Sequence, residues 1–335
     1  MDALRVRWGV LGCSAIAERR ALPALREIDG SEVVGVASRT TERAERFAAE
    51  HGGTALSYQE LVDAPDIDAV YLSLPNSLHF GWAERALRAS KHVLCEKPMT
   101  VSADQTDALV ALAAERGLVL RENFAFLHHP QHDVVRALLE RGRLGRLRTF
   151  SSAFGVPPPK PGDIRYDPAL GAGCLLDVGV YPIRAAQLML GDGLTVAGAT
   201  LRVDTETGVD MAGHALLVSE NGVFADLEFG FQHSYRSRYA LWGDAAHLSL
   251  ERAFTPPAEH RPQLLLEEQD HREEFTLDGA DQFRASLASF ATAVRETRGA
   301  EEEREWLRSA RETARLVEAV QQTAVRVRQR GAVPS

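Results

Sequence analysis

The stretch that decides the fold is Gly9-Val10-Leu11-Gly12-Cys13-Ser14-Ala15-Ile16-Ala17. It ends a short apolar run and opens a helical pattern. A dinucleotide-binding turn has the spacing G-x-G-x-x-G or A, in which the first small residue permits a tight turn and the third lets helix and strand approach. Gly12 and Ala17 occupy these positions, and Ser14 replaces the middle glycine. The stretch therefore predicts a strand, a phosphate-binding loop and a helix whose N-terminus faces a pyrophosphate.

Further β-rich runs and helical stretches alternate along residues 1–122. We expect strands at 5–11, 32–37, 69–74, 92–95 and 119–121, and helices at 16–28, 41–51, 79–90 and 102–116. Alternation of this kind is typical of βαβ units and a parallel sheet. The first domain, 1–122, is therefore predicted to be α/β: a doubly wound, parallel Rossmann domain that binds NADP(H).

The pattern changes over residues 123–335. We expect strands at 147–154, 195–203, 212–219, 223–231, 239–241, 247–250 and 263–266, and helices at 130–141, 175–190, 281–297 and 301–328. Successive strands joined by turns such as Glu220-Asn221-Gly222 predict an α+β domain with a large, mostly antiparallel, open-faced sheet. The acidic run 301–303 predicts a solvated helix face.

Composition narrows the class of protein. The 335 residues favour two domains, and the formal net charge of -9 argues against nucleic-acid binding. We see no signal peptide and no apolar run long enough to span a membrane. Three cysteines, Cys13, Cys95 and Cys174, cannot pair evenly, so we expect reduced, buried thiols and a cytoplasmic protein.

The end of the second strand indicates which nicotinamide cofactor is bound. The segment Val36-Ala37-Ser38-Arg39-Thr40-Thr41 lacks the carboxylate that would bind a ribose 2′-hydroxyl. Ser38 can donate to a phosphate and Arg39 can pair with its charge, which favours NADP(H). The expected cofactor-binding residues are Gly12, Cys13, Ser14, Ala15, Ile16, Ser38, Arg39, Thr40, Arg43, Leu74, Pro75, Asn76, His79, Glu96, Lys97 and Asn123.

Two further motifs carry candidate catalytic residues. Lys97 is one of only three lysines and follows a strand end in Glu96-Lys97-Pro98, where we expect a cis peptide before the proline. In the second motif, Asp177 and Tyr181 are four residues apart and share one helical face. The catalytic candidates are therefore Lys97, Tyr181 and Asp177.

These motifs resemble those of the Gfo/Idh/MocA oxidoreductase family in order and spacing: the Gly12 loop, Pro75-Asn76 with His79, Glu96-Lys97-Pro98, and Asp177-x-Gly179-x-Tyr181. The segments 122–132, 162–166 and 177–184 are most similar to those of NADPH-dependent 3-ketoreductases that act on dTDP-linked keto-deoxysugars in antibiotic sugar biosynthesis. The resemblance implies a Rossmann domain, a sheet domain, a substrate bound between them, and homo-oligomers (dimers or tetramers) formed through the sheet.

A reaction follows from this resemblance. NADPH would deliver hydride to a keto carbon, which the resemblance implies is C-3, while Tyr181 protonates the oxygen. A phenol is protonated at neutral pH and suits donation. Lys97 would hydrogen-bond the same oxygen. The expected substrate-binding residues are Lys97, Phe124, Arg165, Asp177, Tyr181 and Tyr235. A diphosphate would favour basic groups around Arg165 and Arg236.

Other interpretations stay open. The same motifs serve NADP-dependent sugar or dihydrodiol dehydrogenases, a glycosidase of this fold, and non-catalytic NADP-binding regulators. The regulator is disfavoured because it need not keep both Lys97 and Tyr181. His128, His129 and His132 look like metal ligands, but Pro130 interrupts them and no acid or thiol stands at ligand spacing, so we expect no metal.

Overall fold

The computed structural model describes residues 5–296 and 300–330, without the side chains of 300–302. The chain divides into two compact units. The N-terminal unit comprises Met1–His128 and Gln282–Arg311, and the sheet unit comprises His129–Asp281 and Glu312–Ser335. This differs from the single division expected between 122 and 123. The physical reason is that apolar residues near the C-terminus, such as Phe290 and Leu307, belong to the cores of the N-terminal unit.

The N-terminal unit contains a six-stranded, all-parallel sheet in the order β3-β2-β1-β4-β5-β6. Its strands are β1 (Val6–Leu11), β2 (Ser31–Ala37), β3 (Thr54–Leu56), β4 (Ala69–Leu72), β5 (His92–Glu96) and β6 (Leu120–Asn123). Its helices are α1 (Leu22–Arg26), α2 (Thr41–His51), α3 (Tyr58–Asp63), α4 (Asn76–Arg88), α5 (Ala103–Arg116), α8 (Gln282–Glu296) and the first part of α9 (Ala300–Thr323). The predicted Rossmann fold is confirmed, and the strand order reverses between β1 and β4, where such sheets bind ligands.

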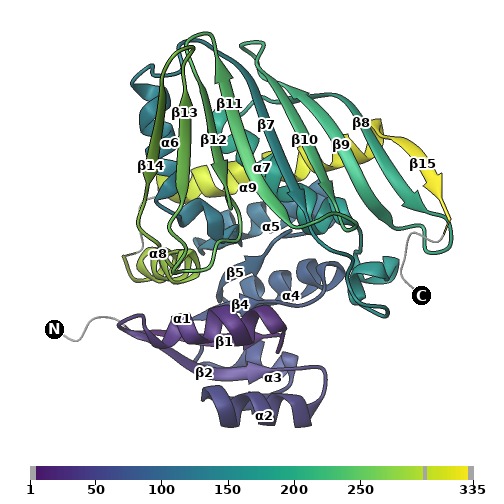
Figure 1. Cartoon of the computed structure of the whole chain (residues 1–335). Helices are drawn as coiled ribbons and strands as arrows, with labels where there is room; N and C mark the ends of the chain where they lie inside the picture. Colours follow the sequence, from purple (N-terminus) through teal and green to yellow (C-terminus); the bar gives the residue numbers. More distant parts are fainter. Residues whose placement is uncertain (1–4, 297–299, 331–335) are drawn as a thin grey trace. The chain divides into compact units, whose positions relative to one another are not determined.

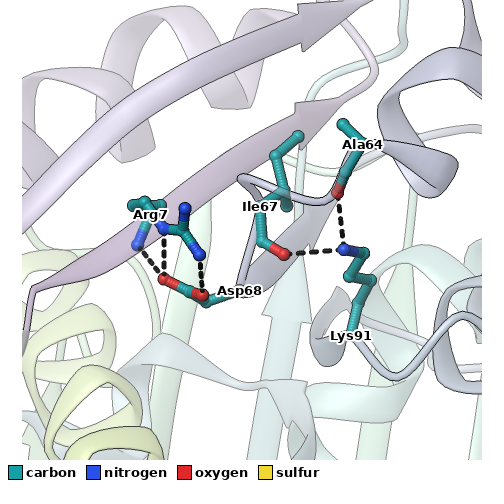
Figure 2. A network of polar contacts seen from close by, with 5 residues as sticks. All are labelled: Arg7, Ala64, Ile67, Asp68 and Lys91. Atoms are coloured by element: carbon teal, nitrogen blue, oxygen red, sulfur yellow. Dashed lines mark hydrogen bonds and ion pairs between the residues drawn. The ribbon is translucent and has the colours of Figure 1, made fainter.

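The amino ends of three strands are tied together by polar contacts (Figure 2). Arg7 on β1 donates from its Nε and Nη2 atoms to the carboxylate of Asp68, which precedes β4, over 3.0 and 2.7 Å. Lys91, which precedes β5, donates to the carbonyls of Ala64 and Ile67 over 2.6 and 2.8 Å. One of the three lysines is thus structural, and it lies at the edge of the sheet opposite the carboxyl ends.

The sheet unit is built on nine strands in the order β14-β13-β12-β11-β7-β10-β9-β8-β15 (Figure 1). They are β7 (Leu147–Gly155), β8 (Thr195–Asp204), β9 (Asp210–Val218), β10 (Phe224–Gly230), β11 (Arg236–Gly243), β12 (His247–Glu251), β13 (Gln263–Glu267), β14 (Arg272–Thr276) and β15 (Val325–Gln329). Only the pairs β7–β10 and β8–β15 are parallel, so the mostly antiparallel sheet is confirmed. The helix expected to reach 328 ends at Thr323, because Val325 and Val327 alternate with arginines and pair with β8.

Helix α7 (Val180–Leu190) packs on β7 and β10 and follows a π-helical turn, Leu175–Gly179. The approach to β10 is close, since a Cβ atom on Gly179 would lie 2.9 Å from the ring of Phe229. The segment Pro168–Leu190 is long and apolar enough to pass a hydropathy test for a membrane span, but 61% of the apolar window is buried inside the fold. Burial of this extent is what a core helix shows. A second helix of this unit, α6, spans Gln131–Glu140.

Candidate active site

The loop after β1 has the geometry that the fingerprint predicts. Gly12 has a φ angle of 113°, and a Cβ atom there would lie 2.7 Å from the carbonyl oxygen of Ser73. A side chain at this position is therefore excluded both by the backbone conformation and by space. The hydroxyl of Ser14 accepts from the backbone N–H of Ala17 over 3.1 Å and donates to the Ser73 hydroxyl over 3.0 Å. Ser14 thus closes the turn and ties it to the end of β4.

Basic and hydroxyl groups gather at the carboxyl end of β2. Arg43 donates to the carbonyl of Cys13 over 2.6 Å, which fastens the start of α2 to the first loop. Arg39 is exposed, and no carboxylate among the described side chains pairs with it. Burial raises the pKa of the Cys13 thiol, which the neighbouring Ser38 and the charge of Arg43 partly oppose. This donor set includes Thr40, which stands at the N-cap position of α2 and whose hydroxyl makes no capping hydrogen bond. The set fits a phosphate on the ribose 2′-oxygen.

The ends of β4 and β5 are joined by His79. Its ring is fully buried, and its two nitrogens lie 2.8 Å from the carbonyl oxygen of Pro98 and 2.7 Å from that of Leu74. Burial lowers its pKa. Both ring nitrogens face backbone carbonyls, so His79 ties the two loops together, and its expected contact with the cofactor stays a prediction. The peptide between Lys97 and Pro98 is cis, as expected.

A hydrogen-bond network surrounds Glu96, the residue before Lys97. Oε1 of Glu96 accepts from the Tyr71 hydroxyl and from Nδ2 of Asn123, each over 2.7 Å. Asn123 in turn accepts from the hydroxyl of Ser286 on α8 over 2.7 Å. Burial raises the pKa of Glu96. The expected residues Glu96, Lys97 and Asn123 therefore meet at adjacent strand ends, and the pattern of the sequence held no signal for Ser286.

The remaining expected cofactor residues lie in the same loops. Cys13, Ala15 and Ile16 follow β1, and Leu74, Pro75 and Asn76 follow β4. Every residue of the expected cofactor set therefore lies at or near the carboxyl edge of the parallel sheet. Phe124, expected to bind substrate, is buried next to β6 and packs at right angles to Phe126, with ring centroids 5.9 Å apart.

The sheet unit holds Tyr181 in the first turn of α7, within an aromatic cluster. Its ring stands at 86° to that of Phe154, with centroids 5.1 Å apart, and lies 5.6 Å from that of Phe254. Tyr235 contacts the same Phe154 at 6.4 Å. We call Phe154, Tyr181, Tyr235 and Phe254 the aromatic cluster. The two tyrosines were predicted from the sequence to be site residues, but no role was predicted for the two phenylalanines, which have only the pattern of apolar strand or loop residues.

Asp177 and Arg165, both expected in the site, are in contact. Arg165 Nε lies 2.9 Å from Asp177 Oδ2, and its Nη1 lies 3.6 Å from a carboxylate oxygen of Asp163. Asp177 stands one helical turn before Tyr181. Arg236, the other basic group considered for a diphosphate, alternates on β11 with Ser237, which is paired with Phe154. Arg236 therefore points to the face of the sheet opposite the aromatic cluster.

Two of the three histidines near residue 130 contact aromatic side chains. His128 belongs to the N-terminal unit and stacks on Trp306, whereas His132 in the sheet unit bonds to the hydroxyl of Tyr239 over 2.8 Å. Among the described residues, the metal-type grouping is Glu18, Glu50 and His51, and the guanidinium of Arg26 lies 3.4 Å from His51. The three cysteines are free and buried, as expected.

Comparison with known proteins identifies the family. Residues 6–124 match the family described as oxidoreductase family, NAD-binding Rossmann fold, and residues 132–249 match the GFO/IDH/MocA C-terminal domain. Over 95% of this chain and 96% of the relative, it is 48% identical to a dTDP-3,4-didehydro-2,6-dideoxy-alpha-D-glucose 3-reductase from Actinomadura kijaniata. The chain belongs to the Gfo/Idh/MocA family of oxidoreductases. The predicted family and enzyme class are thereby confirmed.

Other members of the family extend the comparison. The crystal structure of a 3-ketoreductase from Actinomadura kijaniata, in complex with NADP and TDP-benzene, superposes with a TM-score of 0.94 at 46% identity, covering 97% of this chain and 99% of that one. A D-xylose 1-dehydrogenase (NADP(+)) from Haloferax volcanii is 33% identical over 86% of this chain and 88% of its own length. The expected nicotinamide cofactor agrees with these Gfo/Idh/MocA relatives.

Proposed function

We propose that this Gfo/Idh/MocA protein is an NADPH-dependent reductase of a keto group, at C-3, of a dTDP-linked keto-deoxysugar. The proposal rests on the phenol of Tyr181, held against Phe154 and Phe254 one turn beyond the Asp177–Arg165 pair. It is supported by 48–50% identity to four 3-reductases of such sugars. Crystal structures of the related 3-ketoreductase from Actinomadura kijaniata contain NADP and TDP-benzene.

The N-terminal unit would bind the cofactor through its strand ends. The Gly12 loop leaves the backbone open to a pyrophosphate, while Ser38, Arg39, Thr40 and Arg43 would hold the 2′-phosphate. Bound NADPH supplies a hydride to the carbonyl carbon. The network around Glu96 fixes the strand end that carries Lys97.

Tyr181 donates its phenolic proton to the carbonyl oxygen, and the ammonium of Lys97 donates a hydrogen bond to that oxygen as negative charge develops there. The carbon gains a hydride, the oxygen gains a proton, and the phenolate recovers its proton from solvent. Asp177 is less suited to the donor role because its carboxylate is engaged in an ion pair with Arg165.

Replacing the proposed donor tests this function. Tyr181→Phe should lower the turnover number for a dTDP-keto-deoxysugar by roughly 10²-fold or more, measured as NADPH consumption, with the product configuration assigned by NMR. Tyr239→Phe is a matched control, because it removes a phenol hydroxyl that bonds to His132 instead. An unchanged rate in the Tyr181 variant would remove this residue from the mechanism.

A second candidate is oxidation of a free sugar or diol with NADP+, favoured by the 33% identity to a D-xylose dehydrogenase. The two functions differ in their substrate. Parallel assays with free sugars plus NADP+ and with dTDP-keto-deoxysugars plus NADPH separate them. A reductase turns over only the second mixture at a useful rate.

The sheet supports a homo-oligomer. Phe224 on β10 and Trp242 on β11 are paired in register with Thr149 on either side of β7, so the three lie in one row on one face. Phe224 and Trp242 are exposed by 52% and 64%. Large exposed aromatic side chains of this kind mark association surfaces. Trp242→Glu should convert the oligomer to a smaller species in light scattering, and an unchanged mass would exclude this face.

A further inference from the structure

Arg252, which directly follows β12, has an unusual backbone conformation. Its φ angle is 55°, and Ser90 is the other non-glycine residue with a positive φ in the described part of the chain. Any residue with a Cβ atom pays a free-energy penalty there, so the surroundings must impose the conformation.

The following residues show what imposes it. The backbone N–H groups of Ala253 and Phe254 donate to the carbonyl and hydroxyl of buried Ser237, each over 2.9 Å. The carbonyl of Ala253 accepts from Gln131 on α6 over 3.0 Å. Residues 253 and 254 are thus held from both sides, and the chain leaves β12 through a left-handed residue to reach them.

This conformation places the Arg252 guanidinium on an aromatic ring. Its Cζ atom lies 4.7 Å from the ring centroid of Tyr235, whose hydroxyl is 2.7 Å from that of Thr255. Tyr235 also contacts Phe154 of the aromatic cluster. The short segment 252–255 therefore carries three groups near the aromatic cluster. They are the cation of Arg252, the ring of Phe254 beside Tyr181, and the hydroxyl of Thr255 that bonds to Tyr235.

The charge of Arg252 is available to a ligand. It is exposed, and within the described part of the chain no carboxylate lies at ion-pair distance from it. Arg165, in contrast, is engaged by Asp163 and Asp177. A planar guanidinium without an acidic partner is suited to a phosphate, which it can contact through two parallel hydrogen bonds.

We infer that Arg252, Tyr235 and Thr255 form the subsite for the nucleoside diphosphate of the substrate. The inference rests on the proposed function, because it assumes that the sugar ring lies at Tyr181. Phe154 contacts both Tyr181 and Tyr235, and Arg252 lies over the ring of Tyr235. A diphosphate attached to the sugar would therefore reach the guanidinium of Arg252, while Arg165 remains paired with Asp177. The hydroxyls of Tyr235 and Thr255 bond to each other, so one of the two keeps its proton free to donate to a phosphate oxygen.

Binding of dTDP to the NADP+-loaded protein, followed by calorimetry, tests the subsite without any turnover. Arg252→Gln should raise the dissociation constant of dTDP at least tenfold and leave that of thymidine, which has no phosphate, within twofold. Arg252→Lys should recover part of the loss. Arg236→Gln removes the same charge from the opposite face of the sheet and should leave dTDP binding within twofold.

Arg252→Gly separates folding from binding. Glycine adopts a positive φ freely, so this variant should melt no lower than the parent protein yet bind dTDP as weakly as Arg252→Gln. The inference is overturned if the parent does not bind dTDP, if both Arg252 variants bind it normally, or if Arg236→Gln weakens it equally. A protein that binds dTDP through Arg252 but reduces no dTDP-keto-sugar would keep the subsite and disprove the reductase.

Discussion

Arg165 and Asp177 form an ion pair, with Nε of the arginine 2.9 Å from Oδ2 of the aspartate. The pair is partly exposed, so its contribution to stability is small, under about 1 kcal/mol. The ion pair acts mainly by positioning, because it holds the loop bearing Arg165 beside the helical turn that precedes Tyr181.

We expect Asp177→Asn to act on substrate binding more than on chemistry. The amide keeps the shape but loses the charge, so KM should rise by roughly tenfold with a smaller change in kcat. Arg165→Gln should give a similar change, and the double variant should lose little more than either single one, as contacting residues do. A collapse of kcat in Asp177→Asn, with KM unchanged, would return Asp177 to the catalytic group.

Arg39 should set the preference for NADPH over NADH. It lies at the end of β2 without a carboxylate partner among the described side chains, so it is free to bind the 2′-phosphate. Arg39→Gln is expected to raise KM for NADPH by roughly tenfold or more and to leave KM for NADH unchanged. Steady-state kinetics with both cofactors measures this, and an equal effect on the two would place the 2′-phosphate elsewhere.

Arg121 should be essential for the stability of the N-terminal unit. Its side chain is 3% exposed, pairs with Glu303 on α9 and donates to Ser289 over 3.0 Å. Its Cζ atom lies over the ring of Trp306, 4.8 Å from the ring centroid. Arg121→Met would leave the buried carboxylate without its partner, and should cost about 3–5 kcal/mol in urea unfolding. The exposed pair Arg88–Glu84 is the control: Arg88→Met should cost about 0.5 kcal/mol or less.

Acid should weaken the fold through buried histidines. Burial, followed by the nearby charge of Arg121, lowers the pKa of His128 to about 4, and burial together with His129 lowers that of His132 to about 3. The unfolded state then binds more protons below about pH 6.5, so stability is complete above that pH and is lost as the pH falls, by about 1.4 kcal/mol per unit for each histidine.

The pH dependence is checked by urea unfolding from about pH 7 to about pH 5. His132→Gln should lower stability at neutral pH, because it removes the hydrogen bond between the imidazole and the Tyr239 hydroxyl. It should also make the unfolding free energy less dependent on pH, by the contribution of one proton. A slope identical to that of the parent protein would show that His132 is already charged in the fold.

The sequence predicted the regular parts of the fold well. Strong alternation and the Gly12 turn were sufficient for the parallel sheet, and most strands of the second sheet were expected within a few residues. The three-residue edge strand β3 was missed because so short a run has no measurable period. Of the run 301–303, expected on a solvated face, the side chains of 301 and 302 lie outside the described residues, and that of Glu303 is only 12% exposed. The sequence held no local signal for this burial, because the partner Arg121 lies 182 residues away.

In the candidate site, too, residues in local motifs were predictable and residues placed by long-range packing were not. Glycine spacing, the lysine motif and the Asp177–Tyr181 spacing are local, so they could be read directly. Phe254, Ser286 and Arg252 reach their positions through long-range packing, and nothing in their immediate neighbours marks them. The locations of the cofactor and substrate residues stay predictions until the variants above are measured, as does a cytoplasmic location without nucleic-acid partners.

The discontinuous N-terminal unit has a consequence for biosynthesis. Arg121 and Glu303 are separated by 182 residues, so a ribosome must complete nearly the whole second sheet before the guanidinium meets its carboxylate. Until α8 emerges, Trp8 also lacks the ring of Phe290, 5.4 Å away in the finished protein. A nascent or truncated chain that stops after the parallel sheet therefore presents an incomplete core, and it is during this interval that chaperones and proteases have most to recognise.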